Sequence, residues 1–274
     1  MQYSIVNKSR LHGNLRIDAE FYSPDFLQLE KTLNSHQTKI FSMYSLFIKK
    51  GIFDLSPDFY RDQGIPLIRT SEIKDPQIDF SSTVFLDEKT QALNRKTELM
   101  PGDIVFTKIG AYIGDVAMLP KKYDRYNFSQ NVTGVKLKKD MIMPGFLLAY
   151  LLSKYGKGQI KRIIMLSGQG KLELEDIKNI KVVLLDEKIK ALTHKIVLQV
   201  ELLREKSVNI YREAEQILLS ELGLLNWKPK HQLSFVKNFS NTQSADRIDA
   251  EYFQPMYEEI LSSVSDNTKR VISL

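Results

Sequence analysis

Residues 100–135 carry the strongest structural signal in this chain, in the sequence MPGDIVFTKIGAYIGDVAMLPKKYDRYNFSQNVTGV. The opening Pro101-Gly102-Asp103 has the residue types of a tight turn, because proline fixes one φ angle and glycine allows the next to become positive. The apolar run after it predicts two strands around a polar loop. Gly110 and Gly114 interrupt this run, and a glycine inside a strand pattern indicates a bulge or a close approach to the backbone.

Positive charge is concentrated in the same part of the chain. The loop at residues 120–127 reads PKKYDRYN, and its mixture of cations and aromatic rings suits a phosphate backbone and exposed base edges. Residues 100–181 contain 14 Lys or Arg against 7 Asp or Glu, whereas residues 186–222 contain 6 against 7. We therefore expect this region to bind a polyanion. The alternative is that its lysines are ordinary solvated surface residues.

Several short motifs follow one another in a characteristic order. They are GIPLIRTSEI at residues 64–73, PGDIVFTKIG at 101–110, SQNV at 129–132, LSGQGK at 166–171 and LEDIK at 174–178. In this order they resemble the target-recognition domain of the specificity subunits of type I restriction-modification systems. The resemblance covers about residues 40–185. It implies a mixed α/β (α+β) domain of short strands and helices, followed by a long coiled-coil-type helix.

A second signal is a repeat whose two copies lie near opposite ends of the chain. The sequence RIDAEFYSP at residues 16–24 returns as RIDAEYFQP at residues 247–255, which is 231 residues later. Self-similarity at a long period indicates tandem units, here of about 230 residues. Since full-length specificity subunits carry two recognition domains and two long helices, the resemblance implies a half-length or truncated form. We expect a recognition domain at 1–185, a long helix at 186–222, a linker at 223–245 and the start of a second unit at 246–274.

The long helix is predicted from apolar residues that recur every three or four positions. They cover 29 residues in 8 steps between residues 189 and 218, close to the natural helical period, so we expect a nearly straight helix of about 50 Å. Asp186 can cap its start and Gly223 can end it. The apolar stripe predicts a partner helix and hence a homodimer, and the alternative is that the helix folds back on its own domain. The partner-facing residues are Ile189, Leu192, Ile196, Val200, Leu203, Ile210, Ala214 and Leu218.

The remaining elements are read from shorter patterns. The pattern predicts an edge strand at 4–6, a helix at 25–33 with Pro24 at its start, short strands broken by turns from 40 to 115, and helices at 89–99, 144–155 and 157–166. The helix at 144–155 is apolar almost all round and is expected to be buried. The loop at 167–171 follows, and it lacks the spacing of a nucleotide-binding Walker motif.

The sequence contains no convincing catalytic or metal site. There is no cysteine, and the four histidines are scattered. A nuclease interpretation remains as an alternative, because Asp58, Glu72 and Lys74 have the residue types that bind Mg²⁺ and activate water. Adenine methylation would need an Asn-Pro-Pro-Tyr type motif and a glycine-rich cofactor loop, which are absent. The resemblance implies that S-adenosylmethionine, ATP and Mg²⁺ bind to partner subunits.

The expected function is therefore non-catalytic DNA reading. By resemblance, the chain recognises one half of a bipartite target in double-stranded DNA and docks the methyltransferase (M) and restriction (R) subunits. No apolar stretch reaches the ~20 residues of a membrane span, so we expect a cytoplasmic protein. A rival hypothesis is a protein-interaction scaffold with no DNA role. The candidate DNA contacts are Arg69, Lys108, Tyr112, Lys121, Lys122, Arg125, Tyr126, Gln130, Asn131, Lys161, Arg162, Gln169 and Lys171.

Overall fold

The computed structural model describes residues 4–11, 16–164, 170–228 and 230–267. The chain divides into two compact units, residues 1–201 and 202–274, and the border falls inside the longest helix. Among the described residues, no helix combines the length and the apolar character that crossing a membrane requires.

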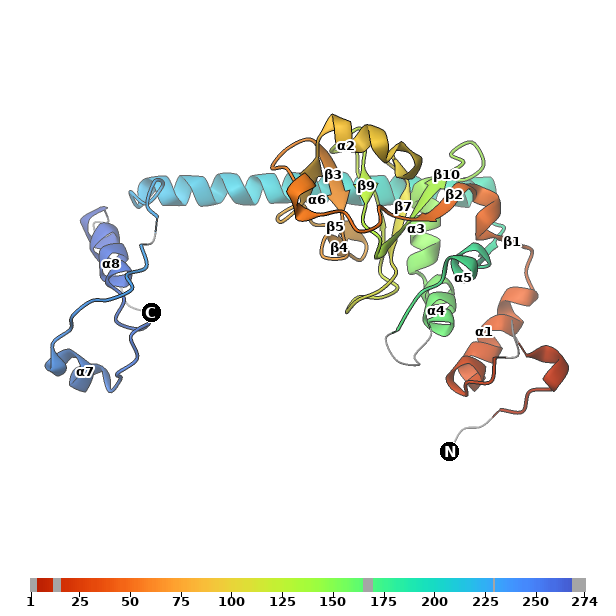
Figure 1. The fold of residues 1–274 in the computed structure, drawn as a ribbon, viewed down its shortest axis with the longest axis horizontal. Coiled ribbons are helices and arrows are strands. Elements are labelled where there is room, and N and C mark those ends of the chain that lie inside the picture. Colours follow the sequence, from red (N-terminus) through yellow and green to blue (C-terminus); the bar gives the residue numbers. More distant parts are fainter. Residues whose placement is uncertain (1–3, 12–15, 165–169, 229, 268–274) are drawn as a thin grey trace. The chain divides into compact units, whose positions relative to one another are not determined.

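Unit 1 is built around a four-stranded antiparallel sheet with the order β2-β10-β7-β8 (Figure 1). Its strands are β2 (Ser45–Lys50), β10 (Val132–Leu137), β7 (Ile104–Thr107) and β8 (Val116–Met118). A three-stranded sheet contains β6 (Val84–Leu86), β3 (Ile65–Ile68) and β9 (Asn127–Phe128), and β3 runs parallel to β9. Two small antiparallel pairs join β1 (Thr38–Ile40) to β11 (Lys181–Val183) and β4 (Ile73–Lys74) to β5 (Gln77–Ile78). The predicted mixed α/β class is confirmed.

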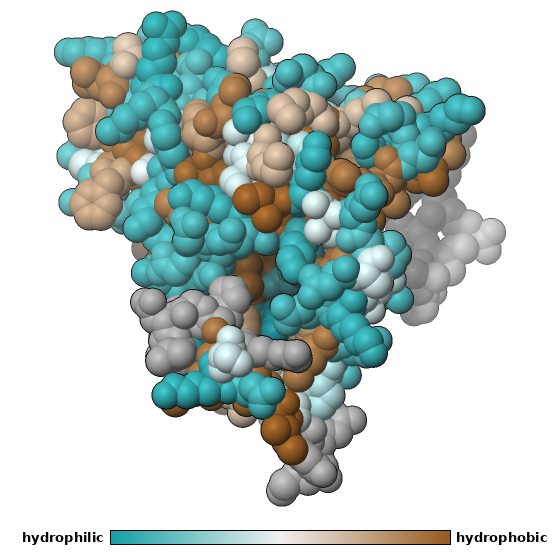
Figure 2. All heavy atoms as spheres, turned by 90° about the vertical axis from the view of Figure 1, so that its right-hand side faces the viewer, coloured by the Kyte–Doolittle hydropathy of each residue, from teal (hydrophilic) through white to brown (hydrophobic). Residues whose placement is uncertain are grey.

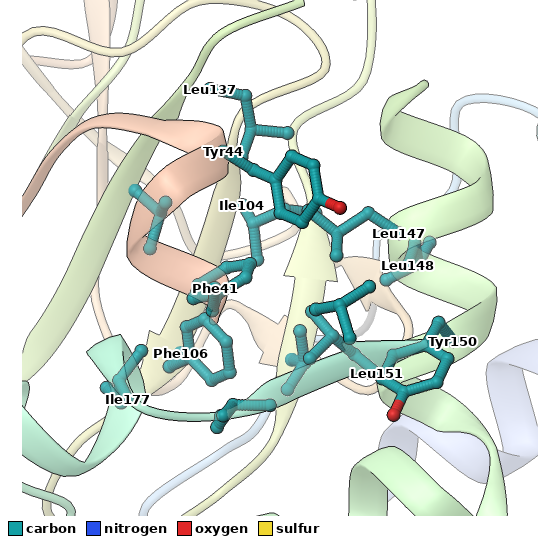
Figure 3. Packing of buried hydrophobic residues seen from close by; sticks show 14 of the residues in the cluster. Phe41, Tyr44, Ile104, Phe106, Leu137, Leu147, Leu148, Tyr150, Leu151 and Ile177 are labelled. Carbon is teal, nitrogen blue, oxygen red and sulfur yellow. The ribbon is translucent and has the colours of Figure 1, made fainter. Parts of the chain in front are cut away.

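Both faces of the four-stranded sheet are covered, so its inner strands β10 and β7 are buried at nearly every position. Successive side chains of a strand point to opposite faces. Ile104 and Phe106 of β7 therefore enter one core together with Phe41, Leu147 and Leu151 (Figure 3). The residue between them, Val105, enters a second core that contains residues of β3 and β9. The outer surface, seen from the end that carries β1 and α1, is largely hydrophilic, with hydrophobic side chains in separate patches (Figure 2).

The predicted strand run after Pro101 contains a hairpin rather than a bulged strand. Gly102 has φ 86°, as expected of the turn that precedes β7. Gly110 and Gly114 have φ 127° and 86°, and both lie in the turn that joins β7 to β8. The positive φ angles explain why glycine occurs at these positions. The glycines thus mark the end of one strand and the beginning of the next.

The short helices agree in part with the sequence patterns. α1 (Pro24–Asn34) confirms the predicted helix with proline in its first turn. α2 (Glu88–Leu93) is shorter than predicted, since a 3-10 turn replaces its end. The predicted helix at 144–155 is wrong in its extent, because Ser153 ends α3 (Pro144–Leu152) and its side chain accepts hydrogen bonds at the start of α4 (Lys154–Ile163). α5 (Leu174–Lys178) follows. The predicted edge strand is also wrong, since residues 4–7 are irregular and precede a 3-10 turn (Lys8–Arg10).

The long helix α6 (Glu187–Glu221) confirms the prediction for residues 186–222. Asp186 Oδ1 accepts a hydrogen bond from Lys188 N (2.8 Å) at its start, and Gly223 has φ 69° just after its end. The predicted stripe is exposed, with values from 43% at Val200 to 64% at Leu203 and Ile210. A different face of α6 meets unit 1, where Val197 and Leu198 pack on the first core. The helix therefore folds back on its own domain through the face with Val197 and Leu198, and the predicted stripe stays accessible.

The described part of unit 2 contains the last part of α6 and the helices α7 (Phe239–Ala245) and α8 (Pro255–Asn267). Gln254 is almost fully buried in this unit. Its side chain accepts a hydrogen bond from Gln232 N and donates one to Gln232 O, both at 3.0 Å. These bonds join the segment before α8 to the segment that follows α6.

Acidification is expected to loosen the packing of the first part of α6 on the sheet domain. His194 Nδ1 accepts a hydrogen bond from Gly145 N (3.1 Å), and burial, with Lys121 nearby, lowers the pKa of His194 from its ordinary 6.5. The contribution to stability is therefore complete above pH 6.5 and is lost as the pH falls through the lower folded-state pKa. Urea unfolding across this range should show a loss of about 1 kcal/mol that His194→Gln abolishes. His36→Gln, at the exposed end of α1, is the control, and an unchanged pH dependence in His194→Gln would refute the assignment.

Candidate nucleic-acid interface

Three lysines gather at one end of the four-stranded sheet. Lys50 is the last residue of β2, Lys108 directly follows β7, and both lie beside the start of β10. Lys108 N donates to Asn131 O (2.9 Å), and Leu172 N donates to Lys108 O (3.0 Å). These bonds bring the turn before β10 and the segment around Lys171 to the same end of the sheet. We refer to Lys50, Lys108 and Lys171 as the lysine cluster.

The lysine cluster places a buried ammonium group beside two more cations. Lys108 is only 4% exposed, and burial lowers its pKa, with further lowering by Lys50 and Lys171. Glu173 acts in the opposite direction, and its carboxylate pairs with Lys171 at 2.5 Å. One carboxylate thus faces three ammonium groups. Such an excess of charge at a poorly hydrated position favours a bound anion.

A polar depression of about 310 Å³ adjoins this end of the sheet. It lies among the loops after β2, β3 and β9, so it shares the turn before β10 with the lysine cluster. Side-chain donors and acceptors line it alongside a few apolar residues, which is the combination that contacts to base edges need. The lining residues are Ile52, Asp54, Leu55, Tyr60, Leu67, Arg69, Thr70, Ser71, Ser129, Gln130 and Asn131.

Arg69, predicted to contact DNA, holds a buried carboxylate at the edge of this depression. Glu72 has no exposed surface and accepts hydrogen bonds from Arg69 N (2.7 Å), Arg69 Nη2 (2.7 Å) and Ser71 Oγ (2.9 Å). Arg69 Nη2 also donates to Ser82 O (2.7 Å). The hydrogen bond to Glu72 raises the pKa of Arg69. The guanidinium therefore fixes the loop after β3, and its 29% exposed side chain forms part of the depression wall.

The turn of the β7–β8 hairpin carries an exposed aromatic ring. Tyr112 is 56% exposed, and Lys74 Nζ lies 5.0 Å from its ring centroid. Lys157 of α4 pairs with Asp75 and reaches Gly114 O at 3.4 Å. Burial, followed by repulsion from Asp75, raises the pKa of Asp115. Tyr112 thus stands beside a cation on a turn that α4 supports.

The basic aromatic loop at 120–127 is mostly engaged in contacts within the unit. Lys122 Nζ lies over the rings of Phe80 and Tyr123, at 4.6 and 5.6 Å. Arg125 donates to Glu88 and lies 3.9 Å from Glu98, while Lys121 remains exposed. The sequence pattern identified the cations of this loop but gave no information about the carboxylates that meet them.

Two of the predicted contacts, Tyr126 and Arg162, have side chains that are engaged inside unit 1. Tyr126 is fully buried, its hydroxyl donates to Pro120 O (2.8 Å), and burial raises its pKa. Arg162 is 12% exposed, donates to Phe21 O and Glu30, and holds α1 against α4. Lys161 on the same helix is exposed. The predicted contact Gln169 lies outside the described residues, as does most of the glycine-rich loop.

Of the predicted contacts, the sheet end therefore gathers Arg69, Lys108, Gln130, Asn131 and Lys171. It adds Lys50, Tyr60 and Thr70, which sequence reasoning missed. A signal for Lys50 existed, since two lysines end the apolar run of β2, but only the pairing of β2 with β10 shows where that end lies.

The residues of the nuclease interpretation do not form a site. Glu72 is buried against Arg69, Asp58 accepts from Ser56 Oγ (2.9 Å), and Lys74 lies over Tyr112. Within the described ranges, no group of three His, Cys, Asp or Glu side chains could hold a metal ion. The geometry therefore does not support metal-dependent cleavage by these residues.

Fold and surface together define a mixed α/β domain with a basic sheet end, followed by a long helix. The chain belongs to the family of the type I restriction modification DNA specificity domain, whose model matches residues 37–196, more than half of the chain. Such a domain reads DNA, in agreement with the predicted non-catalytic role. No curated protein matches the chain in sequence.

Several solved structures are similar to this chain. The S subunit of a type I restriction-modification system from M. genitalium is 18% identical over 76% of this chain and 50% of that one, with a TM-score of 0.45. The HsdS subunit from Thermoanaerobacter tengcongensis is 14% identical over 69% and 45%, with a TM-score of 0.41. The type IIG restriction endonuclease BpuSI is 11% identical over 66% and 29%, with a TM-score of 0.47. The chain spans about half the length of the two S subunits.

Replacing Arg69 by alanine is expected to destabilise unit 1 by about 2–3 kcal/mol, because it leaves the Glu72 carboxylate buried without its cation. Arg69→Leu with Glu72→Leu should recover most of this loss, since the buried charge is then absent. Arg125→Ala is the matched control and should cost less than about 1 kcal/mol, because its pair with Glu88 is exposed. Urea unfolding measures all three. An unchanged stability of Arg69→Ala would show that Glu72 does not depend on the guanidinium.

Proposed function

We propose that the chain reads one half of a bipartite double-stranded DNA target and docks methyltransferase (M) and restriction (R) subunits of a type I system. The observation that carries this proposal is the lysine cluster beside a polar depression, inside the region assigned to the DNA specificity family. S-adenosylmethionine, ATP and Mg²⁺ bind the partner subunits in this proposal, and the chain supplies position and sequence choice.

The lysine cluster holds the phosphate backbone. Lysine is a compact point charge that binds phosphate without reading sequence, so such contacts fix the register of a protein on the duplex. A phosphate that meets Lys50, Lys108 and Lys171 favours the charged form of Lys108, which burial and the neighbouring lysines disfavour. Binding through this cluster therefore depends strongly on salt.

The depression reads the bases. Gln130 and Asn131 offer amide groups that can bond an adenine edge through two atoms, and Thr70 offers a hydroxyl. These side chains lie on the turns next to the lysine cluster, so a duplex held there presents its base edges to them. Tyr112, Lys121, Lys122, Arg125 and Lys161 belong neither to the lysine cluster nor to the lining of the depression, and in this proposal they extend the contact along the DNA.

The helix α6 supports the bipartite part of the proposal. Its 35 residues span about 50 Å, which is enough to separate two recognition domains by more than one turn of DNA. The exposed stripe from Ile189 to Leu218 packs against a second helix of the same kind, since so long an apolar stripe is costly to leave in water. A homodimer built in this way reads a symmetric, two-part target.

Neutralising the lysine cluster is expected to weaken binding to all duplexes alike. In Lys50→Gln, Lys108→Met and Lys171→Gln, the slope of log affinity against log salt should fall by about 1 for each phosphate that the protein no longer neutralises. Lys188→Gln, an exposed change on α6, is the control and should keep the parental slope. Fluorescence anisotropy with duplex DNA at several salt concentrations measures the slope.

Two outcomes of this titration would count against the proposal in different ways. If the parent chain shows no steep salt dependence, the scaffold hypothesis replaces DNA reading. If the parent chain shows it and the three variants keep the same slope, other residues hold the phosphates.

A charge within the stripe is expected to separate the paired helices. Leu203→Glu should raise the dimer dissociation constant at least about tenfold, because pairing would bury an unpaired carboxylate. Val208→Glu, an equally apolar and exposed position outside the stripe, should have little effect. Sedimentation or light scattering over a range of concentrations provides the readout. A parent chain that stays monomeric at high concentration contradicts pairing of α6 with a second copy.

A further inference from the structure

The two copies of the sequence repeat adopt the same local structure. In each, an arginine pairs with the aspartate two residues later, at 2.5 Å for Arg16 and 2.7 Å for Arg247. The same guanidinium lies over the first aromatic ring, 4.2 Å from the centroid of Phe21 and 4.4 Å from that of Tyr252. The two adjacent aromatic rings meet edge to face, at 5.0 Å in the first copy and 4.9 Å in the second. A proline then begins a helix, α1 or α8.

The first copy shows what this motif does. Its rings are buried, with Phe21 3% and Tyr22 7% exposed. Arg162 of α4 places a second guanidinium over Phe21, also at 4.2 Å, and donates to Phe21 O and to Glu30. The motif thus presents an aromatic ring and a backbone carbonyl to an arginine on another helix.

A close helix contact completes the docking of the first copy. Leu29 of α1 rests over Gly158 of α4, where an added Cβ would lie 2.7 Å from Leu29 Cδ2. Glycine at this position therefore allows α1 to approach closely. The receiving surface on α4 consists of this glycine and, four residues later, Arg162.

The second copy exposes the surface that the first copy buries. Tyr252, which corresponds to Phe21, is 47% exposed, and Tyr257 and Leu261 of α8 are 39% and 66% exposed. The repeat spacing aligns Ile260 with Leu29, so the residue that meets the glycine is again a branched aliphatic. The segment is nevertheless held in place by the hydrogen bonds between Gln254 and Gln232. It is a formed surface with an exposed aromatic ring, not an irregular tail.

We infer that residues 247–264 are a docking element for a helix of the α4 kind on a second recognition domain. The partner helix carries a small residue where Ile260 arrives and an arginine four residues later, which stacks on Tyr252 and donates a hydrogen bond to the backbone carbonyl of that residue. One difference defines the partner further. Leu261 stands where the first copy has Glu30, so the partner presents an apolar side chain there and its arginine has no carboxylate from α8. The inference concerns assembly and stands apart from DNA reading.

The α4 helix of this chain is the probe that tests the inference. In the full chain, residues 16–34 are replaced by the sequence of residues 247–265, which has the same length. If the second copy is a docking element, the grafted segment covers α4. The protease should then cleave the grafted chain at a rate within about twofold of the rate for the parent chain. Changing the leucine of the graft back to glutamate should slow cleavage further, because the ion pair with Arg162 returns.

The control graft carries alanine in place of the arginine and the first tyrosine of the motif. It should be cut about tenfold faster or more, since the stacked ring and its cation are removed. A graft cut as fast as this control overturns the inference. If the complete graft prevents folding of unit 1, a helix-only graft, with residues 255–265 in place of 24–34, tests the contact of Ile260 with Gly158. Cleavage of this graft as fast as that of the same graft with Ile260→Ala also overturns the inference. The readout involves no DNA, so its failure is separate from failure of the proposed function.

Discussion

The arrangement of the sheet end depends on how closely Phe128 packs against two glycines. An added Cβ on Gly134 would lie 2.3 Å from the ring of Phe128, and one on Gly51 would lie 2.1 Å from its carbonyl oxygen. That carbonyl accepts a hydrogen bond from Ile52 N (2.8 Å). Phe128 therefore packs tightly between β10 and the end of β2, and a side chain at Gly134 or Gly51 would collide with it. Because residues 129–131 follow directly, this packing fixes the turn that lines the depression and bonds to Lys108.

Two kinds of positive charge result from this architecture. Two cations of the loop at 120–127 lie at the surface beside a carboxylate or a ring, Arg125 beside Glu88 and Lys122 beside Phe80. Lys108 differs because the strand that leads to it is buried on both faces, and the chain carries the ammonium group into a poorly hydrated position beside Lys50 and Lys171. An exposed ion pair contributes little to binding or stability, whereas a buried cation among like charges gains much from an anion. The number of lysines in a stretch is thus a poor guide to where an anion is held.

The long helix and the repeat have a common physical basis. Each buries part of its apolar or aromatic surface within the chain and leaves related surface exposed. α6 buries one face on unit 1 and exposes the stripe, while the aromatic motif is buried on α4 in its first copy and exposed in its second. In both cases the exposed surface is regular and preformed, so binding a partner requires little ordering of the chain.

The sequence by itself determined the mixed fold, the long helix with both of its ends, the turn at Pro101 and the existence of a repeat. These features follow from local periodicity, capping residues and identity between segments, which need no knowledge of contacts. It also supplied the family and five of the residues at the sheet end. Tertiary structure alone decided that Tyr126 and Arg162 are structural, that α3 ends at Ser153, and that Lys50 meets Lys108 and Lys171. The physical reason is that burial and charge pairing depend on which distant strands are neighbours. Lys50 meets Lys108 because β2 and β7 both pair with β10, and this pairing leaves no periodic trace in the segments themselves.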